Sequence, residues 1–154
     1  MEHIVKEMTQ YIEDFVIKPH PVFNNMSVCP FAKKALLKNK IQFEIYDFND
    51  GLKDSFLSII RNFIDQNIFE LLMFIGPNDI DIVKLHNFTK QLEGVFAEVE
   101  VFDGHPQDDF NVAGLYTHRE PYPNIVVQKK SLLNKARNLL KKTRYFDKWN
   151  KIIP

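Results

Sequence analysis

The sequence predicts an α/β fold in which helices flank a mainly parallel sheet of four strands. Segments with apolar residues at helical spacing alternate along the chain with segments of strand-like pattern. Strands that are separated by helices favour parallel pairing, because a parallel pair needs a long crossover connection. The chain has 154 residues, of which 45% are apolar and 14 are Phe, enough for the core of a single domain over residues 1–154.

The first third of the chain predicts two helices and one strand. Apolar side chains recur every three or four positions over residues 2–18, which is typical of an amphipathic helix. The loop 19–28 contains two prolines that end this helix. A short helix is expected over 29–38, and alternation of apolar and polar residues predicts a strand over 41–48.

The remaining elements alternate in the same way. They are, in order, a helix over 51–67 capped by Asp50, a strand over 69–75, a helix capped by Asn78, a strand over 97–102, a short strand over 125–127 and a helix that begins at Ser131. The continuous apolar run at 69–75 is typical of a central strand that is covered on both faces. The long loop 103–123 contains no helical pattern, so the direction of the last strand stays open.

Formal net charge is zero, but the charges are unevenly distributed. Residues 1–128 hold 11 Lys/Arg and 19 Asp/Glu, whereas residues 129–154 hold 9 Lys/Arg and 1 Asp/Glu. This basic segment has no interleaved Gly and aromatic residues. We therefore interpret it as a solvated helix face docked on an acidic body, and we do not expect a nucleic-acid partner.

Composition and patterning also bear on the cellular compartment. No apolar run approaches the length of a transmembrane helix, and we expect neither a signal peptide nor a membrane partner. A single cysteine cannot form an internal disulfide, which fits a reducing compartment, so we expect a cytoplasmic protein. The Cys/His spacings of zinc sites are absent from the sequence.

Cys29, the only cysteine, precedes Pro30 at the start of the short helix over 29–38. Proline is favoured at the first helical position, which places Cys29 at the N-cap. Free backbone N–H groups and the helix dipole favour negative charge there, so we expect a lowered thiol pKa and a reactive thiolate. The alternative is a buried cysteine that acts as a small apolar residue.

The loop 103–123 leaves the end of a predicted strand and carries most of the other groups capable of chemistry. His105 and Arg119 are candidate catalytic residues, because a histidine can activate a thiol and an arginine can stabilise an anion. Candidate substrate-binding residues are Tyr116, His118 and Tyr122, with packing as the alternative for the two tyrosines. We expect one pocket lined by Cys29, His105, Tyr116 and Arg119.

Taken together, the Cys-Pro-Phe-Ala element and the later loop resemble the DUF1415 family of small bacterial proteins. The matching positions are Cys29, Pro30, Phe31, Ala32, His105, Pro106, Phe110, Gly114, Tyr116, Thr117, Arg119, Pro121, Tyr122 and Pro123. His118 and Glu120 stand where that family shows Asn and Ser. The resemblance spans roughly residues 5–145 and implies a small bacterial protein, but it assigns no reaction.

The Cys-Pro helix and the strand after it are also similar to glutaredoxins, so a thioredoxin-like core is a second interpretation of the fold. Ala32 stands where the second cysteine of glutaredoxins would be, and no clear strand precedes Cys29. These two differences favour the layered α/β fold.

Three classes of function are compatible with these residues. The first is a thiol enzyme acting on a small-molecule substrate, with Cys29 as nucleophile or redox thiol and His105 and Arg119 as partners. The second is a haem or metal protein in which Cys29 is the axial thiolate ligand. The third is a non-catalytic binding domain. The thiol enzyme requires no cofactor, whereas the second class requires haem or a metal.

Overall fold

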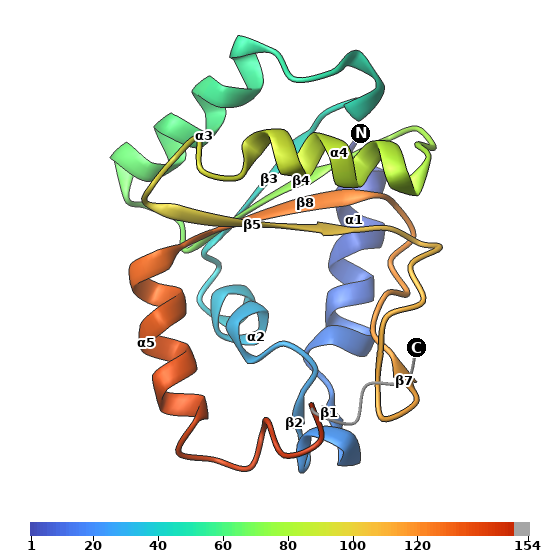
Figure 1. Ribbon diagram of the computed structural model, residues 1–154, viewed down its shortest axis with the longest axis vertical. Helices are drawn as coiled ribbons and strands as arrows, with labels where there is room; N and C mark the ends of the chain where they lie inside the picture. The colour runs from blue at the N-terminus through green and yellow to red at the C-terminus, as the bar shows by residue number, and fades with distance from the viewer. Residues whose placement is uncertain (150–154) are drawn as a thin grey trace.

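The computed structural model describes residues 1–149, and its centre is one four-stranded sheet (Figure 1). The strands lie side by side in the order β3-β4-β8-β5. Their bounds are β3 Ile41–Ile45, β4 Leu71–Ile75, β5 Val99–Gly104 and β8 Asn124–Lys129. The predicted α/β class and the four strands of this sheet are confirmed.

The mainly parallel arrangement predicted from the sequence is wrong. β3 and β4 are parallel, but β8 is antiparallel to both β4 and β5. The connection between β5 and β8 contains only the short strands β6 (Asn111–Val112) and β7 (Leu115–Tyr116) and no helix. Without a helical crossover the chain returns in the opposite direction, and β8 inserts between β4 and β5.

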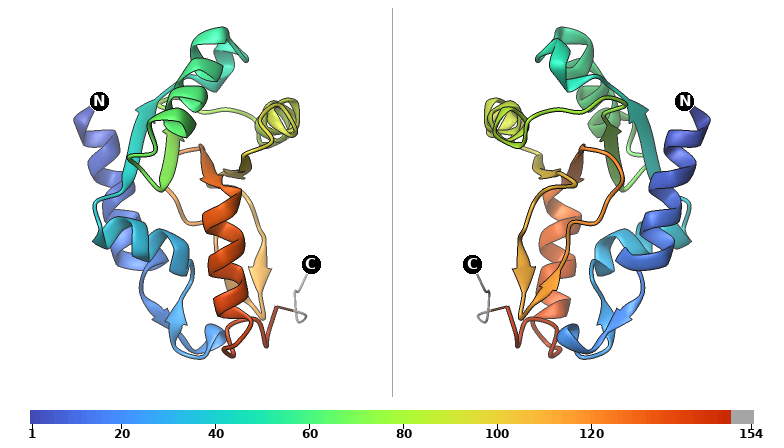
Figure 2. Two further views of the ribbon diagram at one scale, coloured as in Figure 1. Left: turned by 90° about the vertical axis from the view of Figure 1, so that its left-hand side faces the viewer. Right: turned by 90° about the vertical axis from the view of Figure 1, so that its right-hand side faces the viewer.

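Helices cover both faces of the sheet (Figures 1 and 2). α3 (Asp54–Gln66) and α4 (Ile82–Leu92) lie on one face, and α1 (Glu2–Tyr11), α2 (Pro30–Leu37) and α5 (Lys130–Leu140) lie on the other. None of the helices within residues 1–149 combines the length and apolar character needed to span a membrane.

Two small hairpins lie at the end of the α1, α2 and α5 layer that is farthest from the sheet (Figures 1 and 2). One pairs β1 (Pro19–His20) with β2 (Met26–Ser27), and a 3₁₀ turn η2 (Pro21–Phe23) lies between them. The other pairs β6 with β7. All strands of the main sheet follow Cys29, so no sheet strand leads into the Cys-Pro helix, as a thioredoxin-like core would require.

The two faces of the sheet have separate apolar cores. On the α3 and α4 face, the buried rings of Phe56 and Phe74 stack with centroids 3.9 Å apart. On the other face, Met8 packs with the sheet residue Met73. A third cluster around Phe23 joins both hairpins to the chain that follows α5. The second and third clusters are the ones that border the cavity described below.

The first helix changes geometry before it ends. It is α-helical to Tyr11 and continues as a π-helical turn, η1 (Ile12–Val16), in which the Ile17 N–H donates to the Ile12 carbonyl at 3.0 Å. The predicted helix over 2–18 is therefore confirmed in extent but not in uniform geometry. π-Helical turns widen a helix locally and are frequent at functional sites.

Two predicted helix caps are wrong. Asn78 does not cap α4; the Asp81 carboxylate does so, accepting from the N–H groups of Val83 and Lys84 at 2.9 and 3.2 Å. Asp50 does not cap α3 either, because it lies in the 3₁₀ turn η3 (Phe48–Asp50). In both places the α-helix begins further along the chain than predicted, and local spacing does not reveal this.

Candidate ligand-binding cavity

A cavity of about 530 Å³ lies between the sheet and the layer formed by α1, α2 and α5. This volume is within the range of sites that bind small molecules. Most of the wall is apolar, and its side chains come from elements far apart in the sequence. The lining residues include Tyr11, Cys29, Phe31, Leu71, Gly104, Phe110, His118, Glu120, Asn124, Val126, Gln128, Leu133, Tyr145 and Trp149.

The polar end of the cavity is built around the buried carboxylate of Glu120. His118 Nδ1 lies 2.9 Å from Glu120 Oε1, and Asn124 Nδ2 donates to the same oxygen at 3.4 Å. The Tyr11 hydroxyl, from α1, lies 3.5 Å from the other carboxylate oxygen and donates to the Thr117 carbonyl at 3.0 Å. A buried carboxylate needs such partners, and here they also fix the orientation of the imidazole.

Close backbone approach makes this arrangement possible. A Cβ atom added to Gly104, at the end of β5, would overlap Glu120 Oε1 and would lie 2.9 Å from Asn124 Nδ2. Only glycine therefore lets the carboxylate lie against the strand. The requirement for glycine at position 104 thus comes from the tertiary contact with Glu120.

Burial alone would lower the pKa of His118, but the hydrogen bond and negative charge of Glu120, together with the charge of Asp108, raise it above its ordinary value. His118 Nε2 lies 3.8 Å from Asp108 Oδ2, which is beyond hydrogen-bond distance. An ionised Glu120 carboxylate can only accept, so the imidazole donates Nδ1–H to it, and Nε2–H becomes a second donor when the ring is protonated. An imidazole held in this way can act as a general acid.

Cys29 is the N-cap of α2, as predicted, with extended backbone (φ −132°, ψ 94°) and Pro30 as the first helical residue. The expected lowering of its thiol pKa is wrong. Burial raises the pKa of Cys29, although the first-turn N–H groups of Ala32 and Phe31 act in the opposite direction. The thiol lines the apolar cavity, and desolvation of the thiolate outweighs the helix terminus.

Aromatic residues from the chain after α5 close the far side of the cavity. The Tyr145 hydroxyl donates to the Val28 carbonyl at 2.6 Å, and this bond ties the segment to the loop before Cys29. The Tyr145 ring stacks on Phe23 with centroids 5.1 Å apart. Trp149 also lines the cavity, and within residues 1–149 its buried Nε1–H has no hydrogen-bond partner. A bound molecule with an acceptor oxygen would satisfy this donor.

His105 does not lie in this cavity. Its Nε2 donates to the Ile80 carbonyl at 2.6 Å, and its Nδ1 accepts from the Gln107 N–H at 3.1 Å. Both ring nitrogens are therefore used in holding the turn after β5 against the segment before α4. His105 lines a different, smaller depression beside Asp81 and Lys84, which does not include Cys29.

Arg119 and two tyrosines also lie outside the cavity wall. The Arg119 guanidinium lies over the Phe15 ring, 4.2 Å from its centroid, and Nε donates to the Tyr116 carbonyl at 3.1 Å. The Tyr116 side chain is 52% exposed. The Tyr122 hydroxyl donates to Glu7 at 2.5 Å and ties the loop to α1. Of the predicted site residues, the structure brings only Cys29 and His118 to one cavity.

Four cavity residues had no place in the predicted site. Tyr11 and Gln128 lie on elements whose patterns indicated core packing, and Glu120 and Asn124 flank the Pro-Tyr-Pro element. The one signal that could have found Glu120 is a carboxylate in a proline-rich loop two residues from a histidine. Tyr11 is separated from Glu120 by 109 positions, so no local pattern connects them.

Metal ligands are not clustered in the described part of the chain: residues 1–149 contain no group of three or more His, Cys, Asp or Glu side chains arranged to hold a metal ion. Cys29 is the residue that could ligate a haem iron, and the haem-binding alternative stays a prediction.

Comparisons with known proteins add nothing to this description, since no protein family, curated protein or solved structure matches the chain. The resemblance to the DUF1415 family therefore stays a prediction that rests on the residues quoted above.

Proposed function

We propose that this protein binds a small, mainly apolar molecule in the 530 Å³ cavity and that Cys29 and His118 face the bound molecule. One observation carries the proposal: a largely apolar cavity has a thiol in its wall and an imidazole–carboxylate pair at its polar end. Small-molecule sites combine these features, with apolar walls for affinity and a few fixed polar groups for orientation.

Direct binding to the cavity tests the proposal. N-phenyl-1-naphthylamine is a neutral apolar probe whose fluorescence rises in an apolar environment. We expect it to bind the protein and to lose most of its signal when Val126→Phe fills the cavity from β8. Val83→Phe is the matched control, because Val83 lies on α4, is 60% exposed and does not line the cavity.

Circular dichroism melting of both variants separates loss of binding from loss of fold. A probe that does not bind the native protein, or that binds the folded Val126→Phe and Val83→Phe variants equally well, would overturn the proposal.

Catalysis by the same cavity is a second candidate, favoured by the fixed His118–Glu120 pair. In it, His118 replaces His105 as the histidine of the thiol enzyme, and Arg119 has no catalytic part. Labelling of the native protein with an iodoacetamide probe tests the thiol. Because Cys29 is the only cysteine, loss of labelling after preincubation with N-phenyl-1-naphthylamine would place the bound probe against Cys29.

A further inference from the structure

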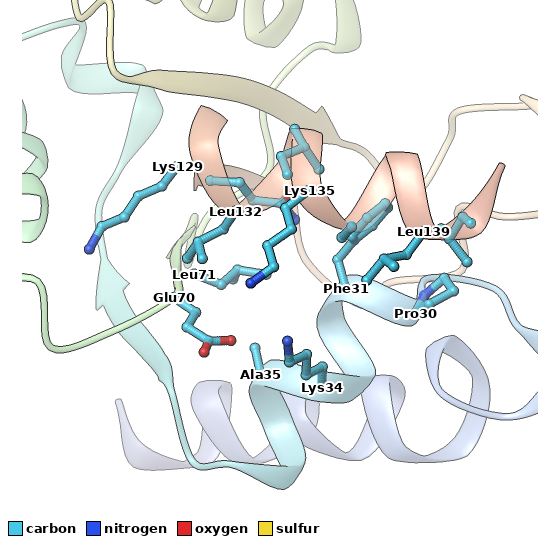
Figure 3. Close-up of a pocket in the computed structure, with 14 residues that line it drawn as sticks. Pro30, Phe31, Lys34, Ala35, Glu70, Leu71, Lys129, Leu132, Lys135 and Leu139 are labelled. Carbon is cyan, nitrogen blue, oxygen red and sulfur yellow. The ribbon is translucent and has the colours of Figure 1, made fainter. Parts of the chain in front are cut away.

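A groove of about 250 Å³ between α2 and α5 adjoins the cavity (Figure 3). Groove and cavity share four lining residues: Phe31, Leu71, Gln128 and Leu133. The groove and the cavity therefore adjoin at these four side chains. We call the groove the mouth of the cavity for this reason.

Apolar side chains lie exposed along this mouth. Leu132 is 41% exposed and Leu139 is 56% exposed, and both lie on α5 beside the groove. Phe31 of α2 reaches towards α5 in Figure 3. Exposed apolar side chains that continue into an apolar cavity suit a ligand with a long apolar body.

Gln128 lies where the two spaces meet, on β8 beside Leu71 of β4. The Gln128 residue is 9% exposed, and its side-chain amide makes no hydrogen bond to another residue within residues 1–149. The amide atoms are not fully buried, so they can hydrogen-bond water in the space where the groove meets the cavity.

Two lysines give the mouth a positive charge. The ammonium groups of Lys34, on α2, and Lys135, on α5, extend over the space between the helices (Figure 3). Among residues 1–149, neither forms an ion pair. The one carboxylate that lines the groove, Glu70, is already paired with Lys38 at 3.7 Å. The mouth therefore favours an anionic group.

We propose that the ligand is a linear anionic amphiphile of the fatty-acid class. Its carboxylate lies at the mouth near Lys34 and Lys135, and its alkyl chain passes along Phe31, Leu71 and Leu133 into the cavity. This inference rests on the proposed function, because the alkyl chain occupies the same cavity. It adds the charge of the ligand, its shape and its direction of entry.

Decanoate and decan-1-ol, which share an alkyl chain and differ in charge, test the inference. Trp149 is the only tryptophan of the chain and lines the cavity, so its fluorescence reports occupancy by either compound. Exposed lysine–carboxylate pairs each strengthen binding by only a few fold, so two lysines should make decanoate bind about tenfold more tightly than decan-1-ol.

Variants then locate the two ends of the ligand. Lys34→Gln with Lys135→Gln should remove most of the preference for decanoate and leave decan-1-ol binding unchanged. Lys141→Gln with Lys142→Gln is the matched control, because both lysines are exposed and neither lines the groove. Val126→Phe should weaken the binding of decanoate, because Val126 lines the cavity that holds the alkyl chain and does not line the groove. Decanoate binding to this variant is measured by calorimetry, because the new ring lies in the same cavity as Trp149 and would alter its fluorescence.

The outcomes separate this inference from the proposed function. Equal affinity for decanoate and decan-1-ol, or a preference for decylamine, would overturn the proposal that the ligand is anionic. The proposal that the cavity binds an apolar molecule would still stand. A decanoate affinity that depends on the lysines but not on Val126→Phe would place the ligand in the groove alone and overturn the continuous path. Failure of all three compounds and of N-phenyl-1-naphthylamine would overturn both proposals.

Discussion

His118 Nδ1 lies 2.9 Å from Glu120 Oε1, and the Glu120 side chain is only 3% exposed. The carboxylate that sets the charge near His118 also contacts Tyr11 of α1 and lies against Gly104 of β5. A change at any of these positions should therefore affect His118.

The first prediction concerns the pKa of His118. The Glu120→Gln variant removes the negative charge that raises this pKa, so the pKa should fall, and NMR titration of the imidazole measures it. Asp109→Asn, in the same loop but exposed, is the control and should leave the pKa unchanged. An unchanged His118 pKa in Glu120→Gln would contradict the assigned contact.

The same pair predicts how stability depends on pH. A histidine whose pKa is raised in the folded state stabilises the fold at pH values below its unfolded pKa, about 6.5, and loses this contribution as the pH rises through the folded pKa. Glu120→Gln should therefore cost more free energy of unfolding at pH 5 than at pH 8, measured by urea denaturation. A larger cost at pH 8 would show that His118 does not stabilise the fold as a cation.

A third prediction concerns Gly104. A Cβ atom at this position overlaps the Glu120 carboxylate, so Gly104→Ala should destabilise the protein by about 1–3 kcal/mol, as overpacking does. Because Glu120 causes the overlap, Gly104→Ala should cost less in a Glu120→Ala background than in the native protein. A double-mutant cycle by thermal or urea denaturation measures this coupling, and simple additivity would refute the contact.

Cys29 supplies the fourth prediction. Because burial raises the pKa of the thiol, the alkylation rate of the native protein should rise only above about pH 8.5, the pKa of a free cysteine. The rate should also be lower than that of the urea-unfolded chain at every pH. Mass spectrometry of iodoacetamide labelling against pH gives both quantities. An apparent pKa well below 8.5 would restore the reactive N-cap thiol expected from the sequence.

Arg119 is the fifth position tested. Its guanidinium lies over Phe15 and holds the Tyr116 carbonyl, and a lysine cannot reproduce this planar arrangement. Arg119→Lys should lower stability by about 1 kcal/mol, or the melting temperature by about 2–4 °C, with probe binding unchanged. Arg144→Lys, at a site with 79% side-chain exposure, is the control. Loss of probe binding without a change in melting temperature would return Arg119 to the binding site.

Features that depend on neighbouring residues could be predicted from the amino-acid sequence alone. Apolar spacing placed the helices and strands, because one face of each element must be buried whatever it packs against. The Cys29-Pro30 pair fixed the start of α2, because proline supplies a backbone angle that suits the first helical position. The four strands of the main sheet could be predicted for the same reason.

Contacts between side chains that are distant in the sequence could not be predicted, because they depend on how the elements pack. The direction of β8 depends on its pairing with β4 and β5, and the sequence of the loop 103–123 does not show that the chain returns between these two strands. His105 and His118 lie in the same loop and looked alike in the sequence, yet His105 bonds to the Ile80 carbonyl and His118 to a carboxylate buried beside Tyr11. Burial at Cys29 likewise reversed the expected pKa shift, because desolvation is produced by side chains brought from distant parts of the chain.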